Sequence, residues 1–450
     1  MSAALRRDCD VLIAGGGAVG SALACALGEL PLDVVLVEAQ QVQLLAQPSF
    51  DARVTALANG SQQILSGLSL WRDLAGYVES IRSIHISERG RFGAARIEAR
   101  EEHVPALGYT VENQTLGRVL WERLQRSARL TVLAPAKVVA LAQEPDHVEV
   151  TVERGGATEI VRARLVVAAD GARSAVRAAL GVATAEDDYG QRAVVFNCST
   201  EARLDGRAFE RFSDRGPIAL LPLSSGRGAV IWTLPEGDAD GIAALPADAF
   251  RAELQTAFGQ RLGRFTRIGE RHLYTLARVA SDAIHGPRAV LIGDAALRLH
   301  PVAGQGFNLA LRDIATLAEV IADELRASTA GGATAMDGGS AANAGEGMDA
   351  RGRATQGAVA GSNSRPTDVG AAPLLERYAA WRAADRQRVS SFTHGLIQLF
   401  GDSAPGMGLG RGLGLMAFDL LPGAKGLLAR QTMGKAGRLP RLARGLPLVG

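Results

Sequence analysis

The sequence of 450 residues contains few cysteines and no long apolar segment. Its three cysteines, Cys9, Cys25 and Cys198, lie far apart and form neither a CxxC pair nor an even disulfide set. They fit a reducing compartment, and we expect them to be small core residues. No window approaches the roughly 20 apolar residues that a membrane-spanning helix needs, and the N-terminus has no signal-peptide pattern. The sequence therefore predicts a cytoplasmic protein for which peripheral attachment to the inner face of the cytoplasmic membrane stays open.

The chain also lacks a marked excess of one charge. Lys plus Arg number 49 and Asp plus Glu 47, a formal net charge of +2, so the composition gives no argument for nucleic acid as a partner. A hydrophobic share of 47% and a charged share of 21% are those of an ordinary globular protein with a large core. Six of the seven histidines show no ligand spacing, so we predict no metal site. These six are His85, His103, His147, His272, His285 and His394.

Glycine, by contrast, is abundant, and it forms the first motif. After the apolar strand "CDVLIA" the chain carries Gly15, Gly17, Ala18 and Gly20 ahead of a helix, and Glu38 ends the next strand. Gly15 permits the tight turn, Gly17 lets a pyrophosphate approach the backbone, and Gly20 lets helix and strand pack closely. A carboxylate at Glu38 accepts ribose hydroxyls and repels a 2′-phosphate, which favours FAD or NAD over NADP. The alternative is a glycine turn that serves packing alone.

Two further segments run from a strand into a turn and a helix. "LVVAADGARS" ends its strand at Asp170 and Gly171, which indicates either a nucleotide contact or a simple helix cap. "AVLIGDAALRLHPVAGQGFN" ends its strand at Asp294 and places Gly304 and Gly306 at the start of an amphipathic helix. The two glycines let the backbone approach a flat ligand, and the helix amides stabilise negative charge on it.

The order of these three motifs resembles that of the FAD-dependent aromatic-ring monooxygenases, the class similar to para-hydroxybenzoate hydroxylase. Four other stretches resemble its ubiquinone-biosynthesis branch: "FDARVTALANGSQQILSGLSLW" (50–71), "VENQTLGRVLWERL" (111–124), "GRAFERFSDRGPIALLPL" (206–223) and "HGLIQLFGDSAPGMGLGRGLGLMAFDLL" (394–421). The resemblance runs from about Asp10 to Gly434. One departure is Leu297, where many of these hydroxylases carry His, although the ubiquinone branch varies there.

The resemblance implies roles for individual residues. Asp294 would accept hydrogen bonds from the flavin's ribityl chain, and the start of the following helix would lie along the isoalloxazine ring. Arg53 would stand near flavin and substrate and Arg118 near the FAD phosphates or ribityl chain, with a surface ion pair as the alternative for each. His300 would shape or polarise the site, or else be a loop histidine bonded to the backbone. The expected cofactor contacts are Gly15, Gly17, Ala18, Gly20, Glu38, Arg53, Arg118, Asp170, Gly171, Asp294, Gly304, Gln305, Gly306, Phe307 and Asn308, and the expected catalytic residues are His300 and Arg53.

The resemblance also implies the reaction. NAD(P)H would reduce the flavin, O₂ would form a hydroperoxide at its C4a atom, and the distal oxygen would pass to a phenol carbon. The implied substrate is a polyprenylated phenol, 2-polyprenyl-6-methoxyphenol, converted to its 1,4-benzoquinol in ubiquinone biosynthesis. Hydroxylation at another ring position, a flavin-bearing assembly subunit without turnover, and a plain NAD-dependent dehydrogenase stay open as alternatives. Candidate pocket walls, which are equally candidates for ordinary core, are Phe196, Phe212, Leu221, Pro222 and Trp232.

The predicted fold is α/β, with a discontinuous Rossmann-like FAD-binding domain, a mainly antiparallel β-sheet substrate domain and C-terminal helices. Residues 327–369 have almost no large apolar side chain, so we predict a disordered insertion there. The predicted segments are 1–75, 109–183 and 274–326 for the FAD-binding domain, 76–108 and 184–273 for the substrate domain, and 370–450 for the helical C-terminal region.

The last 50 residues, 401–450, carry seven basic side chains and two acidic ones among Leu, Met and Phe. Such a segment is typical of one that lies on an anionic bilayer, with each cation contributing roughly 1 kcal/mol near the surface. The alternative is a frayed basic tail that binds nothing. Besides this peripheral membrane contact, other ubiquinone-biosynthesis proteins are expected partners.

Overall fold

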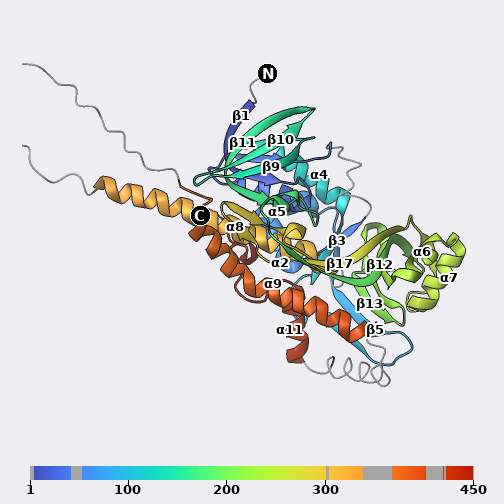
Figure 1. Ribbon diagram of the computed structural model, residues 1–450. Helices are drawn as coiled ribbons and strands as arrows, with labels where there is room; N and C mark the ends of the chain where they lie inside the picture. The colour runs from blue at the N-terminus through green and yellow to red at the C-terminus, as the bar shows by residue number, and fades with distance from the viewer. Residues whose placement is uncertain are drawn as a thin grey trace, which may run out of the picture.

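The computed structural model describes residues 5–41, 53–300, 304–337, 367–401, 419 and 422–448. In this part of the chain the strands form three sheets, and two long helices, α8 and α9, run beside them (Figure 1). The architecture confirms the predicted α/β class with its FAD-binding fold, its antiparallel second sheet and its C-terminal helices.

The first sheet has the strand order β18-β19-β11-β1-β2-β8, with the β9–β10 hairpin attached to β11. Its strands are β1 (Leu5–Ala14), β2 (Val34–Val37), β8 (Leu130–Leu133), β9 (Lys137–Gln143), β10 (Val148–Arg154), β11 (Ala157–Ala168), β18 (His285–Gly286) and β19 (Ala289–Leu291). The pairs among β19, β11, β1, β2 and β8 are parallel, and these strands are apolar runs because both faces are covered. One face packs in a common core with α1 (Ala18–Leu27), α4 (Asn113–Leu124) and α8 (Gln305–Asp337).

The second sheet has the order β20-β17-β12-β15-β14-β13-β5-β6, with β16 paired to β12. Its strands are β5 (Ser83–Glu88), β6 (Ala94–Glu98), β12 (Thr184–Thr200), β13 (Arg207–Ser213), β14 (Gly216–Pro222), β15 (Gly228–Pro235), β16 (Phe265–Ile268), β17 (His272–Ser281) and β20 (Leu297–Arg298). All its pairs are antiparallel except β13 with β5. Helices α6 (Glu236–Ala244) and α7 (Ala247–Phe258) pack on one face, whose apolar side chains form a separate core.

A small third sheet joins the two larger ones. It contains β3 (Val54–Ala58), β7 (Gly108–Glu112) and β4 (Glu79–Ile81), in the order β3-β7-β4. Strand β4 falls in the predicted substrate segment yet pairs with β7, while β20 and most of β17 fall in a predicted FAD-binding segment yet belong to the second sheet. The two regions therefore exchange short strands at their boundary, next to α2 (Asn59–Gly67), α3 (Trp71–Leu74) and α5 (Ala175–Ala179).

The C-terminal helices return along the FAD-binding region. The predicted disordered insertion 327–369 is helical up to Asp337, where α8 ends, and its last residues pack against the fold, since Val369 is buried and Asp368 pairs with Arg288 at 2.7 Å. Residues 338–366 lie outside the described residues. Helix α9 (Ala372–Gly401) packs against α8 and continues toward the second sheet, where α11 (Pro422–Thr432) covers β5 and β6 (Figure 1). No helix in the described ranges combines the length and the apolar character needed to cross a membrane.

Two predictions about composition can be compared with this packing. All three cysteines are buried free thiols, which confirms them as core residues, and burial raises the pKa of each to about 12. In the described part of the basic C-terminal segment, Lys425 pairs with Glu101 at 3.4 Å and Arg441 pairs with Asp323 at 2.7 Å. This part is folded against the protein and is not a frayed tail.

Candidate functional site

The glycine turn after β1 has the geometry that a bound pyrophosphate needs. Gly15 has a φ of +102°, and a Cβ added there would lie 2.4 Å from the carbonyl oxygen of Ala169. A Cβ at Gly20 would lie 1.8 Å from the Gly15 carbonyl oxygen, so close packing forbids a side chain at either position. At Gly17, the N-cap of α1, no heavy atom of the described residues lies within 4 Å of such a Cβ, and none of their side chains caps the helix. The N-terminus of α1, which begins at Ala18, therefore faces open space with its amides available to an anion.

Glu38 is fixed beside this turn. Its Oε2 atom accepts a hydrogen bond of 2.6 Å from the Gly16 amide, and its Oε1 atom accepts one of 2.8 Å from the Gln40 amide. Each carboxylate oxygen has a second lone pair, so both can still accept a bond from a ribose hydroxyl. The structure thus holds Glu38 in place without using its full accepting capacity.

Asp170 caps the start of α5, which agrees with the helix-cap interpretation of its motif. Its Oδ2 atom accepts hydrogen bonds from the amides of Ala175, at 2.8 Å, and Val176, at 3.3 Å. Its Oδ1 atom is buried and has no partner among the described residues. Gly171 follows with a φ of +86° and open space where a side chain would lie. The cap and a ligand contact through Oδ1 are therefore compatible.

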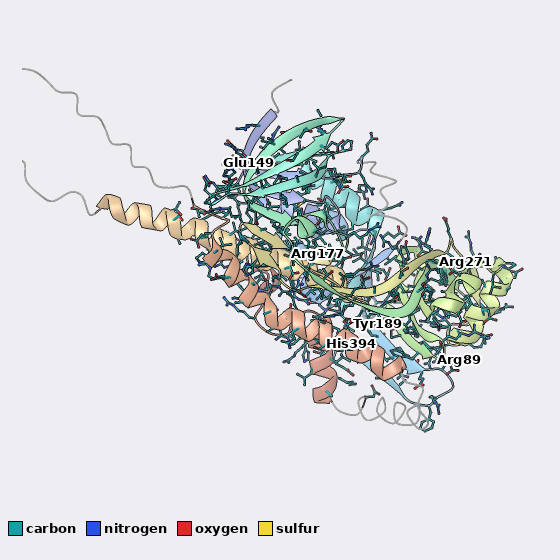
Figure 2. All side chains as sticks on the ribbon, viewed as in Figure 1. Arg89, Glu149, Arg177, Tyr189, Arg271 and His394 are labelled. Carbon is teal, nitrogen blue, oxygen red and sulfur yellow. The ribbon has the colours of Figure 1, made fainter. Side chains whose placement is uncertain are left out.

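Arg177 joins the second motif to the third, a link that the sequence did not reveal. Its Nη2 atom donates to the Ala172 carbonyl at 2.6 Å, and its Nη1 atom donates to the Ala295 carbonyl at 2.9 Å. Ala295 belongs to the short 3₁₀ helix η3 (Gly293–Ala295), which directly follows β19. Figure 2 shows Arg177 in the interior, near α5 and α8. The side chain sets the spacing between the two loops.

Asp294 and Arg53 belong to one electrostatic group. Burial raises the pKa of the Asp294 carboxyl, while the positive charges of Arg298 and Arg53 oppose that rise. The Asp294 side chain is surrounded by protein atoms, which raises its pKa, but it remains accessible to solvent. The Arg53 guanidinium lies 4.8 Å from the centre of the Tyr274 ring on β17. Arg53 thus acts electrostatically on Asp294 and contacts the second sheet, and its place near flavin and substrate stays a prediction.

Asn308 fastens the start of α8 to the third sheet. Its Oδ1 atom accepts hydrogen bonds of 2.7 Å from the Ala58 amide and the Ser61 hydroxyl. Its Nδ2 atom donates to the carbonyl oxygens of Ala56, at 2.7 Å, and Gly304, at 2.6 Å. Because these four bonds use the donors and acceptors of the amide, we interpret Asn308 as a residue that positions this loop and not as a ligand contact.

The neighbours of Asn308 divide between packing and open space. Gly304 has a φ of +57°, which favours glycine, and no heavy atom in the described part of the chain lies within 4 Å of a Cβ added at Gly306. Gln305 is buried near Thr432, and Phe307 packs partly against the core. The backbone at Gly306 is therefore the part of this loop that a flat ligand can approach.

His300 lies in a small aromatic group. The side chain is buried, and the Tyr189 ring stands perpendicular to it at a centroid distance of 5.4 Å. His394 of α9 lies 6.3 Å from Tyr189, and Figure 2 shows these two residues close together. Burial lowers the pKa of His300 to about 4, so the imidazole is neutral at neutral pH. The following Pro301 lies outside the described residues.

Arg118 has the geometry of its alternative interpretation. Its Nη1 atom lies 3.2 Å from Glu122, one helical turn further along α4, and its guanidinium lies 5.0 Å from the centre of the Tyr77 ring. Such an i,i+4 pair is partly exposed and contributes little to stability. The predicted contact of Arg118 with the FAD phosphates or ribityl chain stays a prediction.

The candidate pocket walls fall on both faces of the second sheet. Phe196 and Trp232 pack against Phe250 of α7, so they belong to the core of that region. Leu221 lies on the opposite face and is only half-buried. The same face carries Glu210, which the sequence did not single out because its environment depends on strand pairing.

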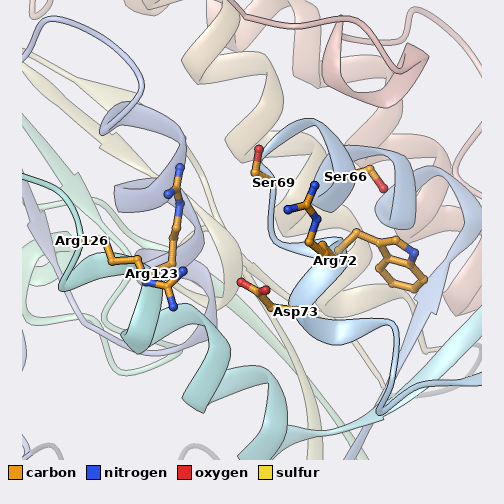
Figure 3. Close-up of a pocket in the computed structure, with 7 residues that line it drawn as sticks. Ser66, Ser69, Arg72, Asp73, Arg123 and Arg126 are labelled. Atoms are coloured by element: carbon orange, nitrogen blue, oxygen red, sulfur yellow. The ribbon is translucent and has the colours of Figure 1, made fainter.

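A surface pocket occurs elsewhere, between α3 and the end of α4 (Figure 3). Its lining residues are Ser66, Ser69, Trp71, Arg72, Asp73, Arg123 and Arg126. None of the predicted site residues belongs to this set, so the pocket is separate from the site built by the three motifs.

Comparisons with known proteins agree with this geometry. Residues 8–336 match the family model described as FAD binding domain. The chain is 36% identical over 442 residues to "Ubiquinone hydroxylase UbiL" of Rhodospirillum rubrum, covering 98% of this chain and 93% of that protein. It is 31% identical over 317 residues to the "3-demethoxyubiquinol 3-hydroxylase" of Escherichia coli, covering 69% of this chain and 79% of that protein. The p-nitrophenol 4-monooxygenase PnpA from Pseudomonas putida DLL-E4 shares the fold with a TM-score of 0.71 at 18% identity, covering 97% of this chain and all of that one.

Proposed function

Because the chain belongs to the family of FAD-dependent aromatic-ring monooxygenases that act in ubiquinone biosynthesis, we propose that it hydroxylates a 2-polyprenyl-6-methoxyphenol to the 1,4-benzoquinol. FAD is the cofactor, NAD(P)H the electron donor and O₂ the second substrate. The observation that carries the proposal is the contact among the three motifs: Cβ atoms added at Gly15 and Gly293 would lie 2.4 Å from the Ala169 carbonyl oxygen and 3.0 Å from Val19 of α1, and Arg177 donates to carbonyls of the second and third motifs. When bound, FAD takes a hydride from NAD(P)H and delivers one oxygen atom of O₂ to the ring.

The residues present fit FAD. The open space at Gly17 and the uncapped start of α1 would receive the pyrophosphate, and Glu38 would accept the ribose hydroxyls. The exposed Asp294 carboxylate would accept hydrogen bonds from the ribityl chain. The amides at Gly306 and the N-terminus of α8 would face the isoalloxazine and stabilise negative charge on it.

His300 would form part of the wall of the active site, beside the flavin, as a neutral and buried imidazole. A neutral ring packed against Tyr189 would exclude water without adding a positive charge to the site. Exclusion of water favours transfer of oxygen to the ring over its loss as H₂O₂. We therefore assign His300 to coupling of NAD(P)H oxidation with hydroxylation, and Arg53 to binding at the junction of flavin and substrate.

A second ring position is favoured by one specific observation. The Escherichia coli relative at 31% identity is named for hydroxylation at the 3-position of a demethoxyubiquinol. A demethoxylated quinol is therefore the second candidate substrate, on the same site and by the same chemistry.

The test uses purified protein, NAD(P)H, O₂ and both ring compounds, with the products identified by mass spectrometry. We expect a flavin absorbance spectrum, accelerated NAD(P)H oxidation with the methoxyphenol, and a product heavier by one oxygen atom. A protein without flavin would indicate a dehydrogenase, and bound flavin without phenol-dependent oxidation would indicate an assembly subunit. In a deletion strain, accumulation of the demethoxylated quinol would move the assignment to the second ring position, and unchanged ubiquinone would refute the pathway.

We also propose peripheral membrane contact through α11 and the turn between β5 and β6, because a polyprenyl substrate partitions into bilayers. Leu427 of α11 is 72% exposed and Phe92, in the turn between β5 and β6, is 66% exposed. Asp419, which precedes α11, accepts a bond of 2.9 Å from the Arg96 amide of β6 and lies 3.6 Å from Lys425 of α11. Replacement of Leu427 and Phe92 by Glu should abolish cosedimentation with anionic liposomes without loss of flavin, and unchanged cosedimentation would refute the contact.

A further inference from the structure

Glu210 lies on the half-buried face of the second sheet. On β13 it is opposite Ala219 of β14 and Ile86 of β5, and the same row continues through Ile231 of β15 to Val195 of β12. Directly opposed residues of neighbouring strands point to the same face. All five side chains are half-buried. Apart from the carboxyl of Glu210, the row is apolar.

The opposite face of the same strands is the packed core. Phe209, next to Glu210 in sequence, packs against Phe258 of α7 at a centroid distance of 5.8 Å. Leu220, next to Ala219, belongs to the same cluster. Since side chains alternate along a strand, Glu210 and Ala219 point away from α7. The face they share is thus the one that α6 and α7 leave uncovered.

This face adjoins the loop at the start of α8. The Thr110 hydroxyl donates to the carbonyl oxygen of Pro222, at the end of β14. Thr110 pairs with Ala56, whose carbonyl accepts the bond from Asn308, and a Cβ added at Gly304 would lie 3.2 Å from the Ala56 methyl group. Pro222 is three residues beyond Ala219, or roughly 10 Å along the strand. Glu210 therefore lies within the reach of a substituted ring held between this face and the loop.

The Glu210 carboxyl has neither an ion pair nor a hydrogen bond within the described ranges, and burial raises its pKa to about 7. A carboxyl removed from water without a partner costs free energy, so its presence among apolar side chains does not serve stability. A carboxyl that titrates near neutral pH is suited to general-base catalysis.

Few titratable side chains share the face that carries Glu210. Strands β14, β15 and β12 present Ala219, Leu221, Ile231 and Val195 on this face, so none comes from them. Burial is the sole cause of the pKa shift of Glu210, and no charged group among the described residues contributes to it. The titratable side chains on the same face or on the helix packed over β5 are Glu88, His272, Tyr274, Lys425 and Arg430.

We propose that the Glu210 carboxylate is the catalytic base that takes the proton of the substrate's phenol hydroxyl. The phenol O–H bond breaks, its electron pair stays on the phenol oxygen, and an O–H bond forms on Glu210; no electrons are transferred in this step. The resulting phenolate is richer in electrons at the carbon para to its oxygen, which promotes attack there by an electrophilic oxygen. The protonated carboxyl later returns the proton to solvent. This inference rests on the proposed function, because it requires a phenol as substrate.

The test compares the flavin-loaded enzyme with Glu210→Gln, which keeps the size of the side chain but removes the base. We expect wild-type product formation to rise with pH through an apparent pKa near 7 and then level off. Glu210→Gln should form product about 100-fold more slowly at pH 7, and should recover as pH approaches the phenol's own pKa of about 10. Glu253→Gln, an exposed ion-pair change on α7, is the matched control and should behave as wild type.

Two measurements without turnover separate a base from a structural residue. A bound phenol should show the absorbance of a phenolate in wild type and of a neutral phenol in Glu210→Gln. Glu210→Leu should melt no lower than wild type, because it removes a buried carboxyl that has no partner. An unchanged pH profile in Glu210→Gln, or a phenolate signal in that variant, would overturn the assignment of Glu210 as the base. Either result would leave the proposed function intact. If wild type forms no quinol and binds no phenol, the proposed function fails and this inference fails with it.

Discussion

The buried ion cluster between α8 and α9 makes Asp313→Ala the most informative single change for stability. Asp313 and Arg382 are each 1% exposed, and the Arg382 Nε atom lies 2.6 Å from Asp313. Arg386 donates to the other oxygen of Asp313 at 3.1 Å, and Arg312 pairs with Asp385 at 2.8 Å. With three arginines and two aspartates the cluster has a formal charge of +1, which Asp313→Ala raises to +2.

The magnitude follows from the burial of these groups. Removal of one partner from a buried ion pair typically costs 3 to 5 kcal/mol, because the remaining charge loses its compensation but stays out of water. Arg382 retains Asp385 at 2.7 Å, which offsets part of the loss. We therefore expect Asp313→Ala to lower the free energy of unfolding by about 3 kcal/mol. Flavin retention should also decrease, because Arg312 donates at 3.3 Å to the carbonyl of Asn308, which positions the loop at the start of α8.

Urea unfolding followed by far-UV circular dichroism, with flavin fluorescence as a second signal, measures both effects. Asp248→Ala is the control, because its pair with Arg251 is on the surface and should leave the midpoint unchanged. A loss below about 1 kcal/mol for Asp313→Ala would mean that water reaches the cluster and that the argument from burial is wrong.

Four other expectations follow from the same structure. Gly17→Val should leave the apoprotein folded, since open space surrounds the position, but should abolish the flavin absorbance; a yellow variant would contradict the pyrophosphate site. Arg177→Met should lower the free energy of unfolding by about 2 kcal/mol and reduce flavin content, because two backbone carbonyls lose their donor. Calorimetry measures the first effect and flavin absorbance the second, and wild-type values of both would refute the role of Arg177 in spacing the two loops. The pKa of His300 is about 4 in the folded protein and 6.5 in the unfolded chain, so the unfolded state binds more protons below pH 6.5 and the free energy of unfolding decreases toward pH 4. In His300→Gln this decrease, measured by urea unfolding at several pH values, should be smaller by up to roughly 3 kcal/mol. An equal decrease in both proteins would contradict the burial of the ring. Deletion of residues 340–364 should leave the melting temperature nearly unchanged, and a large decrease would show that this polar stretch contributes packing.

The parts of the site that the sequence predicted are those in which local conformation determines the chemistry. Gly15, Gly17 and Gly20 are required by the turn itself, so their spacing between a strand and a helix was sufficient to place them. The same holds for Asp294, which directly follows a buried strand. Turns of this kind are readable because each depends on fewer than ten consecutive residues.

The parts that the sequence did not predict depend on which strands become neighbours. Phe196 and Leu221 both belong to strands with alternating pattern, but alternation does not say which face meets a helix and which meets a ligand. Glu210 becomes notable only once β14 and β5 pair on either side of it. Arg177 likewise acts on a carbonyl 118 residues away. No single sequence contains a local signal for such contacts.

The strand order of the first sheet has a consequence for biosynthesis. Along the chain, strand β19 follows every strand of the second sheet except β20, and helix α8 follows all of them. They complete the first sheet and the loop that Asn308 binds, 250 residues from Ala58. During translation the N-terminal glycine turn emerges early, while its counterpart at the start of α8 emerges only after the other region has been made. Contacts over such sequence separations form late in folding. About two thirds of the 450 residues must therefore be synthesised before the chain can enclose a flavin, so we expect flavin to bind only late in synthesis or after release from the ribosome.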